Sequence, residues 1–338
     1  MPQSVCTGYG MCPGSLKLDN HTILDIIRES GGATTKTSED IKRATGITER
    51  RWCDPDQNEN AATLGIRAAQ IAINQAGIEP HDIDCLICSG VVPYYGFDLP
   101  NTASVIAGAL GMRHDVPSFP INVACSGFIY GLMLADSLLT TTFQRILLVC
   151  SEVISLIINK KQFEIATLFG DAAGAIVLER QEKSPYGIRD VRCYMWPDET
   201  SLVIPAGGSK TPLTPERMRE MEHMIHMQGR AVYRTAVAKF TKMIYDSIAR
   251  NNLPVSCISI YPHQANLRII QEVAVRTEIP FSKFYVNIQR YGNTSSASIP
   301  LALCEAVEEG RLKKGDHIVL AAVGAGISGG SAYLVWGS

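Results

Sequence analysis

Hydrophobic residues recur along the chain in two patterns that alternate. Short runs rich in β-branched residues, such as DCLICSG and RILLVCSE, predict buried strands. Longer segments with apolar residues three and four apart predict helices. The expected strands are residues 84–90, 121–124, 145–152, 174–180, 257–262, 284–288, 317–323 and 331–336, and the expected helices are residues 60–77, 126–140, 229–251, 266–278 and 295–311. This alternation is typical of an α/β protein whose sheets are covered by helices.

The order of elements is similar in the two parts of the chain. In the first part, a strand-like run leads to Cys125, a helix and a buried strand. In the second part, another run leads to Asn293, a helix and a buried strand. Polar turn residues in 183–200 interrupt the pattern between them. We therefore predict a duplicated fold with halves at residues 1–182 and 183–338, each presenting one residue at a strand-to-helix junction.

Composition narrows the class of protein. The chain has 338 residues, 46% of them hydrophobic and 19% charged, with a formal net charge of -2. No basic tract predicts a nucleic-acid partner. No apolar run reaches the roughly 18 residues of a membrane span, and the N-terminus lacks the features of a signal peptide. The 10 cysteines have no framework spacing, so we expect reduced thiols in a cytoplasmic protein without membrane contact.

Two short motifs have spacings that metal sites use. Cys85 and Cys88 form a CxxC in a strand-like run without a second pair. His223 and His226 stand three apart without a third ligand, so a solvated helix face is the better interpretation. We expect no metal site.

Cys125 is the first candidate for chemistry. It precedes the expected helix, whose unpaired N–H groups carry partial positive charge and would lower the pKa of the thiol. A thiolate nucleophile also needs a base or a hydrogen-bond donor, and His263 and Asn293 both follow strands in the second half. A packed core thiol, a structural histidine and a helix cap are the alternatives, and spacing alone leaves them open.

Five strings of residues resemble β-ketoacyl-acyl-carrier-protein synthase III of the thiolase superfamily, and the resemblance runs from about Thr37 to Trp336. The strings are PHQANLRII, GNTSSASIP, VACSGF, FGDAAGAIVL and VGAGISGGSAYLVW, of which the first two are long and specific. The resemblance implies a thiolase-like five-layered αβαβα fold made of two similar halves. It also implies a homodimer and no bound cofactor, because acyl-CoA or acyl-carrier-protein thioesters serve as substrates.

The resemblance implies roles for three residues. Cys125 matches the nucleophile that takes the acyl group as a thioester, and His263 and Asn293 match the pair that promotes decarboxylation of a malonyl thioester. The expected reaction is a decarboxylative Claisen condensation in fatty acid or specialised polyketide-type biosynthesis. The alternatives are a non-decarboxylating acyltransferase acting on an alcohol, amine or other acceptor, and a catalytically inert subunit. Asn293 favours condensation, and the presence of Cys125 disfavours the inert subunit.

The resemblance also assigns residues to the walls of the site. The oxyanion loop matches Gly324, Ala325 and Gly326, with alanine where the family has glycine. This GAGISG string also fits GxGxxG, but it leads into a strand near the chain end, which disfavours a nicotinamide site. The acyl pocket matches Leu99, which would reach into the partner subunit, together with Phe169, Met227 and Gly229, and the carrier entrance matches Asn266 and Arg268.

The sequence departs from the family where coenzyme A is gripped. The family holds the adenine between a tryptophan and an arginine, and these positions are Ile41 and Ala44 here, whereas Arg43 is expected to point elsewhere. A second arginine position is Phe163. Isoleucine stacks on a flat base less well than an aromatic ring does. We therefore predict weaker or altered use of coenzyme A, with an acyl carrier protein as the alternative donor.

Overall fold

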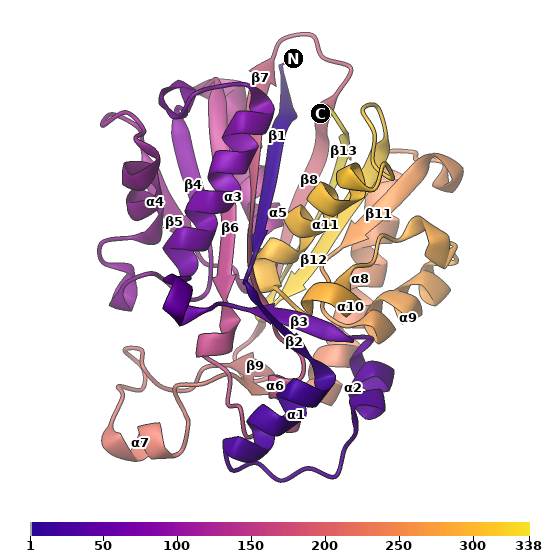
Figure 1. Ribbon diagram of the computed structural model, residues 1–338. Coiled ribbons are helices and arrows are strands. Elements are labelled where there is room, and N and C mark those ends of the chain that lie inside the picture. Colours follow the sequence, from indigo (N-terminus) through magenta and orange to yellow (C-terminus); the bar gives the residue numbers. More distant parts are fainter. Residues whose placement is uncertain (1) are drawn as a thin grey trace.

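The computed structural model describes residues 2–338, and two large β-sheets with three layers of helices form most of this part of the chain (Figure 1). The first sheet has the order β1 (Gln3–Pro13), β7 (Asp171–Gln181), β6 (Arg145–Val153), β4 (Cys85–Ser89) and β5 (Ser118–Ile121). The second sheet has the order β11 (Ile258–Pro262), β12 (His317–Gly324), β13 (Gly326–Val335) and β8 (Gly187–Asp198).

Helices cover both faces of each sheet. Helices α5 (Gly127–Thr141) and α11 (Ser298–Glu308) lie between the sheets, and their side chains form one core cluster with residues of both. Helices α3 (Ala61–Ala76) and α4 (Thr102–Leu110) cover the outer face of the first sheet, and α8 (Gly229–Arg250) and α9 (Leu267–Thr277) that of the second. This arrangement confirms the thiolase-like αβαβα fold.

Shorter elements complete the fold, and most of those labelled in Figure 1 lie below the two large sheets. They are β2 (Leu16–Asp19), β3 (Glu49–Trp52), β9 (Leu202–Val203), β10 (His226–Met227), α1 (Asn20–Glu29), α2 (Ser38–Thr45), α6 (Phe163–Ala166), α7 (Pro215–Arg219) and α10 (Ile288–Tyr291).

The five long predicted helices are confirmed, with each end within three residues of its expected position. The predicted strand at 284–288 is wrong: Phe284 forms an isolated bridge to Ile260, and α10 begins at Ile288. The Gln264 side chain replaces a neighbouring strand there, because its Nε2 donates to the carbonyl of Tyr285 and its Oε1 accepts from the N–H of Asn287. Periodicity cannot reveal a side chain that satisfies the backbone in this way.

The region 183–200, expected to be a break between the halves, contains the twelve-residue strand β8. This strand lies at the edge of the second sheet and pairs with β13 along one side, so polar residues are compatible with its position. Strand β1 was not predicted at all. The strands of the first sheet come from residues 3–181 and those of the second from 187–335, whereas a domain boundary at 182/183 stays a prediction.

One helical window within residues 2–338, Ala124–Thr141, is long and apolar enough by composition to cross a membrane, which differs from the expectation that no run would reach this length. The window is α5 with the turn before it. Helix α5 contacts strands of both sheets, and its place in the middle layer accounts for its apolar composition.

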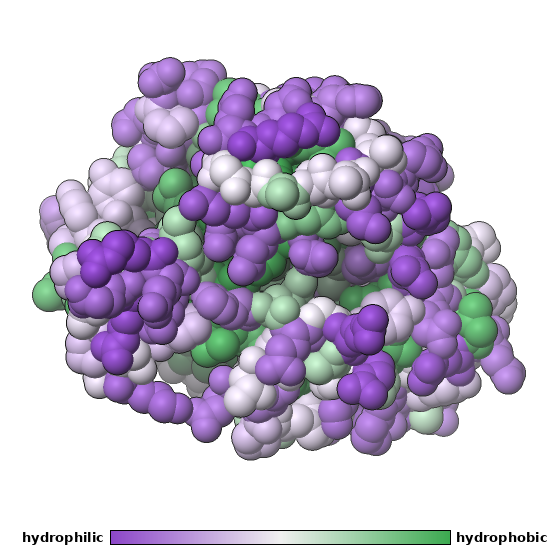
Figure 2. Space-filling model, turned by 90° about the horizontal axis from the view of Figure 1, so that it is seen from below, coloured by the Kyte–Doolittle hydropathy of each residue, from purple (hydrophilic) through white to green (hydrophobic). Residues whose placement is uncertain are grey.

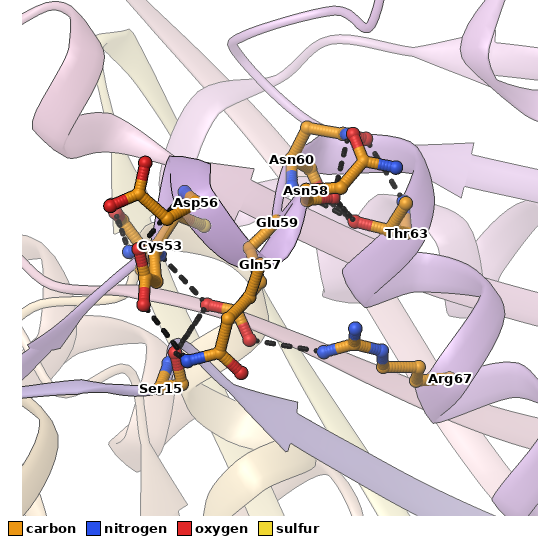
Figure 3. A network of polar contacts seen from close by, with 11 residues as sticks. Ser15, Cys53, Asp56, Gln57, Asn58, Glu59, Asn60, Thr63 and Arg67 are labelled. Carbon is orange, nitrogen blue, oxygen red and sulfur yellow. Dashed lines mark hydrogen bonds and ion pairs between the residues drawn. The ribbon is translucent and has the colours of Figure 1, made fainter.

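The loop before α3 is fixed by a buried carboxylate. Glu59 Oε2 accepts hydrogen bonds from the backbone N–H groups of Ser15 and Asp54, both at 2.9 Å, and Glu59 Oε1 pairs with Arg67 at 3.0 Å (Figure 3). Burial opposes ionisation, but these hydrogen bonds hold the pKa of Glu59 below its ordinary value. Glu59 thereby ties the connection between β1 and β2 to α3.

The two middle helices begin in the same way. A 3-10 turn, η4 (Ala124–Ser126), precedes α5, and a second, η8 (Ser295–Ala297), precedes α11. The first residue of each turn has a left-handed backbone, with φ of 45° at Ala124 and 49° at Ser295. The two turns contact each other. This repeated junction brings Cys125 next to the segment that follows Asn293.

Candidate active site

Cys125 lies in η4, immediately before α5, and is 9% exposed. Its Sγ accepts a hydrogen bond from the Ser295 hydroxyl at 3.5 Å. Gly127 allows this turn to approach β4, because a Cβ there would lie 1.8 Å from the Ser89 hydroxyl oxygen. The N-terminus of α5 therefore begins directly beside the sulfur.

The expected lowering of the Cys125 pKa is wrong for the free protein. Burial raises the pKa of this thiol to about 12, the hydrogen bond from Ser295 opposes the rise, and the charge of Glu152 adds to it. Desolvation outweighs the partial charge of the helix terminus. The thiol is therefore protonated at neutral pH and has to lose its proton during the reaction.

His263 follows β11 and is 1% exposed. Its Nδ1 lies 2.6 Å from the Ser298 hydroxyl, and that oxygen also accepts from the N–H of Gln264 at 3.3 Å. Burial lowers the pKa of His263 to about 3, although a hydrogen bond to the Ser295 backbone opposes the shift. The imidazole is therefore neutral across the physiological range.

Asn293 lies between α10 and η8 and is 5% exposed. Its backbone exchanges hydrogen bonds with the chain around Phe169, since its N–H donates to Leu168 and its carbonyl accepts from Gly170. The side-chain Oδ1 accepts from the N–H of Ser295 at 2.9 Å. Because the oxygen is occupied, the amide nitrogen is the atom available to donate to a substrate.

Cys125, His263 and Asn293 line one cavity of about 240 Å³. Its walls come from α2, α6, α8 and α9, and most of them are apolar. Seen from below, the molecule shows hydrophobic residues in hollows between polar rims (Figure 2). The three residues that sequence analysis placed in separate halves therefore meet at one site.

A second cavity, of about 210 Å³, also reaches Cys125. Phe169 lines both cavities, and its role in an acyl pocket stays a prediction. The other apolar side chains of this second cavity were missed by sequence analysis: Val91, Ile154, Leu202, Val203, Ile204 and Ile225. They come from four separate segments of the chain, and no local pattern connects them.

Of the other residues predicted for the acyl pocket, two line the first cavity and one lines neither. Met227 and Gly229 line the first cavity, with His263 and Asn266, and do not line the second. Leu99 is 80% exposed and lines neither cavity. Its predicted role concerns the pocket of a partner subunit and stays a prediction.

The glycine-rich loop between β12 and β13 lies against the nucleophile. A Cβ at Gly324 would lie 3.0 Å from the backbone nitrogens of both Cys125 and Ser126, a tight contact that glycine avoids. Ala325 lines the second cavity. The left-handed backbone of this loop falls on Gly326, with φ of 101°, and not on Ala325, which explains why alanine is tolerated there.

The predicted entrance residues have different surroundings. Asn266 caps α9, donates from Nδ2 to the carbonyl of Ala44 at 3.2 Å and lines the first cavity. Arg268 lines a surface depression beside that cavity, together with Arg230 and Arg234. The mouth of the first cavity therefore has three guanidinium groups on one side.

The positions that the resemblance assigns to the coenzyme A clamp carry no guanidinium group. Ala44 and Phe163 line the cavity, and Ile41 is fully buried in the core below α2. Arg43 pairs with Asp40 at 2.6 Å, its side chain is 77% exposed, and it does not line the cavity. No cluster of three or more His, Cys, Asp or Glu side chains suited to a metal occurs in residues 2–338.

Comparisons with known proteins place this geometry in a family. The family model described as 3-oxoacyl-[acyl-carrier-protein] synthase III matches residues 119–195, and the model of its C-terminal part matches residues 248–336. The β-ketoacyl-[acyl-carrier-protein] synthase III of Roseiflexus sp. (strain RS-1) is 37% identical over 335 residues, which cover 98% of this chain and 97% of that protein.

Solved structures agree with this match. The crystal structure of 3-oxoacyl-[acyl-carrier-protein] synthase III from Aquifex aeolicus VF5 is 31% identical, with a TM-score of 0.86 over 98% of this chain and 100% of that one. The priming β-ketosynthase of the R1128 polyketide biosynthetic pathway is 28% identical, with a TM-score of 0.87 over 99% and 97% of the two chains. The chain therefore belongs to the 3-oxoacyl-[acyl-carrier-protein] synthase III family.

Proposed function

We infer that the protein is a condensing acyltransferase of the β-ketoacyl-acyl-carrier-protein synthase III type, which loads an acyl group on Cys125 and extends it with a malonyl thioester. The observation that carries this inference is the meeting of Cys125, His263 and Asn293 on one buried cavity. A nucleophile alone fits many acyl transfers, whereas a nucleophile facing two neutral hydrogen-bond donors fits a reaction that builds an enolate.

Acyl loading is the first half of the reaction. The Cys125 sulfur bonds to the carbonyl carbon of the donor thioester, the donor sulfur leaves, and the proton of Cys125 ends on that departing thiol. The N–H groups of the Cys125 turn and of the Gly324–Gly326 loop are close enough to serve as the oxyanion site. The second cavity, which also touches Cys125, accommodates the acyl chain.

Condensation is the second half. The malonyl carbon–carboxylate bond breaks, carbon dioxide leaves and the electron pair enters the enolate, whose oxygen accepts hydrogen bonds from His263 and Asn293. The Ser298 oxygen accepts from Gln264, so its own hydrogen is free to donate to Nδ1 of His263. That arrangement leaves Nε2–H as the imidazole donor. The carbanion then attacks the acyl carbon, and Cys125 thiolate leaves and takes a proton from solvent.

A non-decarboxylating acyltransferase on the same fold is the second candidate. It would use Cys125 and the oxyanion loop, and an alcohol or amine would replace the carbanion. Such a reaction builds no enolate and has little need of the Asn293 amide as a second donor, which is why condensation is preferred.

Carrier-bound thioesters are the proposed substrates, and no cofactor is required. The cluster of Arg230, Arg234 and Arg268 at the mouth suits the phosphate of a pantetheine arm and an acidic carrier surface. Ala44 and Phe163, which line the cavity at positions where the resemblance expects arginines, offer no guanidinium group to a nucleotide. We therefore propose that an acyl carrier protein is a better donor than coenzyme A.

We also propose that the protein forms a homodimer. The loop at 94–99 exposes several large apolar side chains, among them Phe97 at 93% and Leu99 at 80%. Burial of these side chains against a second copy removes apolar area from water. Leu99 from one subunit then borders the acyl cavity of the other.

The decisive experiment follows the acyl group by intact mass. The protein is incubated with acyl-CoAs and acyl carrier proteins of increasing chain length, and the adduct should be absent in Cys125→Ala. Addition of malonyl carrier protein should then discharge the adduct with release of carbon dioxide. Discharge without carbon dioxide would favour the simple acyltransferase, and absence of any Cys125 adduct would refute both.

A further inference from the structure

Ser295 has a backbone conformation that its residue type seldom adopts. Its φ of 49° lies in the left-handed region, although it is not glycine, asparagine or aspartate, and it is 2% exposed. Strain of this kind costs on the order of 1–3 kcal/mol and persists where the surrounding structure enforces it, often at functional sites. The contacts of Ser295 therefore need an explanation.

The turn around Ser295 is held from two directions. The Ser295 N–H donates to Asn293 Oδ1 at 2.9 Å. The next residue, Ser296, donates from its N–H and its hydroxyl to Glu152 Oε1, at 3.2 and 2.5 Å. Glu152 is fully buried on β6 and also accepts from the N–H of Val91 at 3.0 Å. The turn is therefore anchored to the first sheet.

The consequence of this anchoring is the position of the Ser295 hydroxyl. Ser295 Oγ lies 3.5 Å from Cys125 Sγ, with the hydroxyl as donor. Both residues also line the second cavity. With φ in the usual helical region, the side chain would leave the backbone in another direction, so the strained conformation is what aims the hydroxyl at the sulfur.

We propose that Ser295 is a further catalytic residue, whose hydroxyl donates a hydrogen bond to the Cys125 sulfur when that sulfur carries negative charge. The proposal rests on the proposed role of Cys125 as the acyl carrier. Sulfur becomes anionic twice, as it attacks the donor thioester and as it leaves the condensed product. Ser295 transfers no proton in either step. It stabilises the charge in a buried site that contains the opposing carboxylate of Glu152.

The alternative is a purely structural hydroxyl, and the neighbouring residue supplies the control. Ser296 is also a buried serine of the same turn, but its hydroxyl contacts Glu152 and not the sulfur. Ser295→Ala removes the hydroxyl and keeps the strain, whereas Ser295→Gly removes both the hydroxyl and the strain. An equal effect in the two variants would therefore show that the hydroxyl, and not the strained backbone, is responsible.

The experiment measures alkylation of Cys125 by iodoacetamide between about pH 6 and pH 10, because only the thiolate reacts. The modified Cys125 peptide is quantified by mass, since the chain has other cysteines. The hydroxyls of Ser295 and Ser296 both lower the pKa of Glu152, which burial raises to about 7, so the variants are compared at the alkaline end of this range, where Glu152 is ionised in each. Hydrogen bonds to charged groups predict a rate about tenfold lower in Ser295→Ala and Ser295→Gly at each pH below the thiol pKa.

Ser296→Ala should change the rate by less than about twofold. Wild-type alkylation in both Ser295 variants would overturn the proposal, and so would an equal loss in Ser296→Ala, because the effect would then come from the turn as a whole. The assay does not depend on acyl transfer. Failure of the proposed condensing function would therefore leave the alkylation contrast intact, so the two failures are distinguishable.

Discussion

Asn293→Asp tests whether the Asn293 amide serves condensation and not acyl loading. The side chains have the same shape, and the Asp oxygen that replaces Oδ1 can still accept from the N–H of Ser295 at 2.9 Å. What changes is the other terminal atom, where an oxygen replaces the donating NH2 group. Because Asn293 is only 5% exposed, the new carboxylate is largely removed from bulk solvent.

The two half-reactions should respond differently. Acyl loading depends on Cys125 and the oxyanion loop, and we expect its rate to change by less than about fivefold, because the Ser295 contact is kept. Decarboxylation loses one of two donors to the developing enolate, and removal of one such donor typically costs about 10²–10³-fold in rate. The variant should therefore accumulate acyl-Cys125 that malonyl carrier protein cannot discharge.

The assay combines intact-mass detection of the Cys125 adduct with measurement of released carbon dioxide, on the wild type and on both Asn293→Asp and Asn293→Ala. The alanine variant also loses the acceptor for Ser295, so only it should slow loading. Condensation by Asn293→Asp at the wild-type rate would refute the assigned role of the amide. Equal loss of loading and condensation would show that Asn293 acts by holding the turn.

Three further predictions follow from contacts in the structure. Because burial lowers the His263 pKa from 6.5 to about 3, the unfolded chain binds the extra proton first as pH falls through this window. The free energy of unfolding should thus fall with decreasing pH by up to about 1.4 kcal/mol per pH unit. Denaturant titrations at a series of pH values should show that the free energy of unfolding of His263→Gln depends less steeply on pH. Leu99→Phe should slow loading of long acyl chains more than of acetyl groups; identical chain-length profiles would contradict a place for Leu99 beside a partner's cavity. Glu59→Gln places an amide against Arg67 and should cost about 1–3 kcal/mol in urea unfolding, with Gln57→Ala as a nearby exposed control.

Sequence reasoning worked where the information was local. The five long helices follow from apolar residues at helical spacing, and the buried parallel strands follow from short β-branched runs. Cys125, His263 and Asn293 stood out because each lies in a specific string at the end of a predicted element. Their meeting on one cavity also required the duplicated fold, which the resemblance to a family supplied.

It failed where distant side chains set the outcome. The segment at 284–288 looks like a strand, but Gln264 takes up its backbone groups. The terminus of α5 predicted a more acidic thiol at Cys125, but burial among residues from both halves has the larger effect. The second cavity collects apolar side chains from separate loops, such as Val91, Ile154 and Ile225, and no window of sequence contains them together.

The repeated turn explains why the chemistry requires both halves. Each middle helix begins at a 3-10 turn with one left-handed residue, and each turn presents a different function: the nucleophile Cys125 after Ala124, and the hydroxyl of Ser295 after the Asn293 amide. The first half alone would have the Cys125 sulfur without these donors. The second half alone would have the donors without the sulfur. Because Glu152 on the first sheet holds the turn of the second half, a shift between the halves would move the donors relative to the sulfur. The site therefore depends on the packing between the halves as much as on the residues that line it.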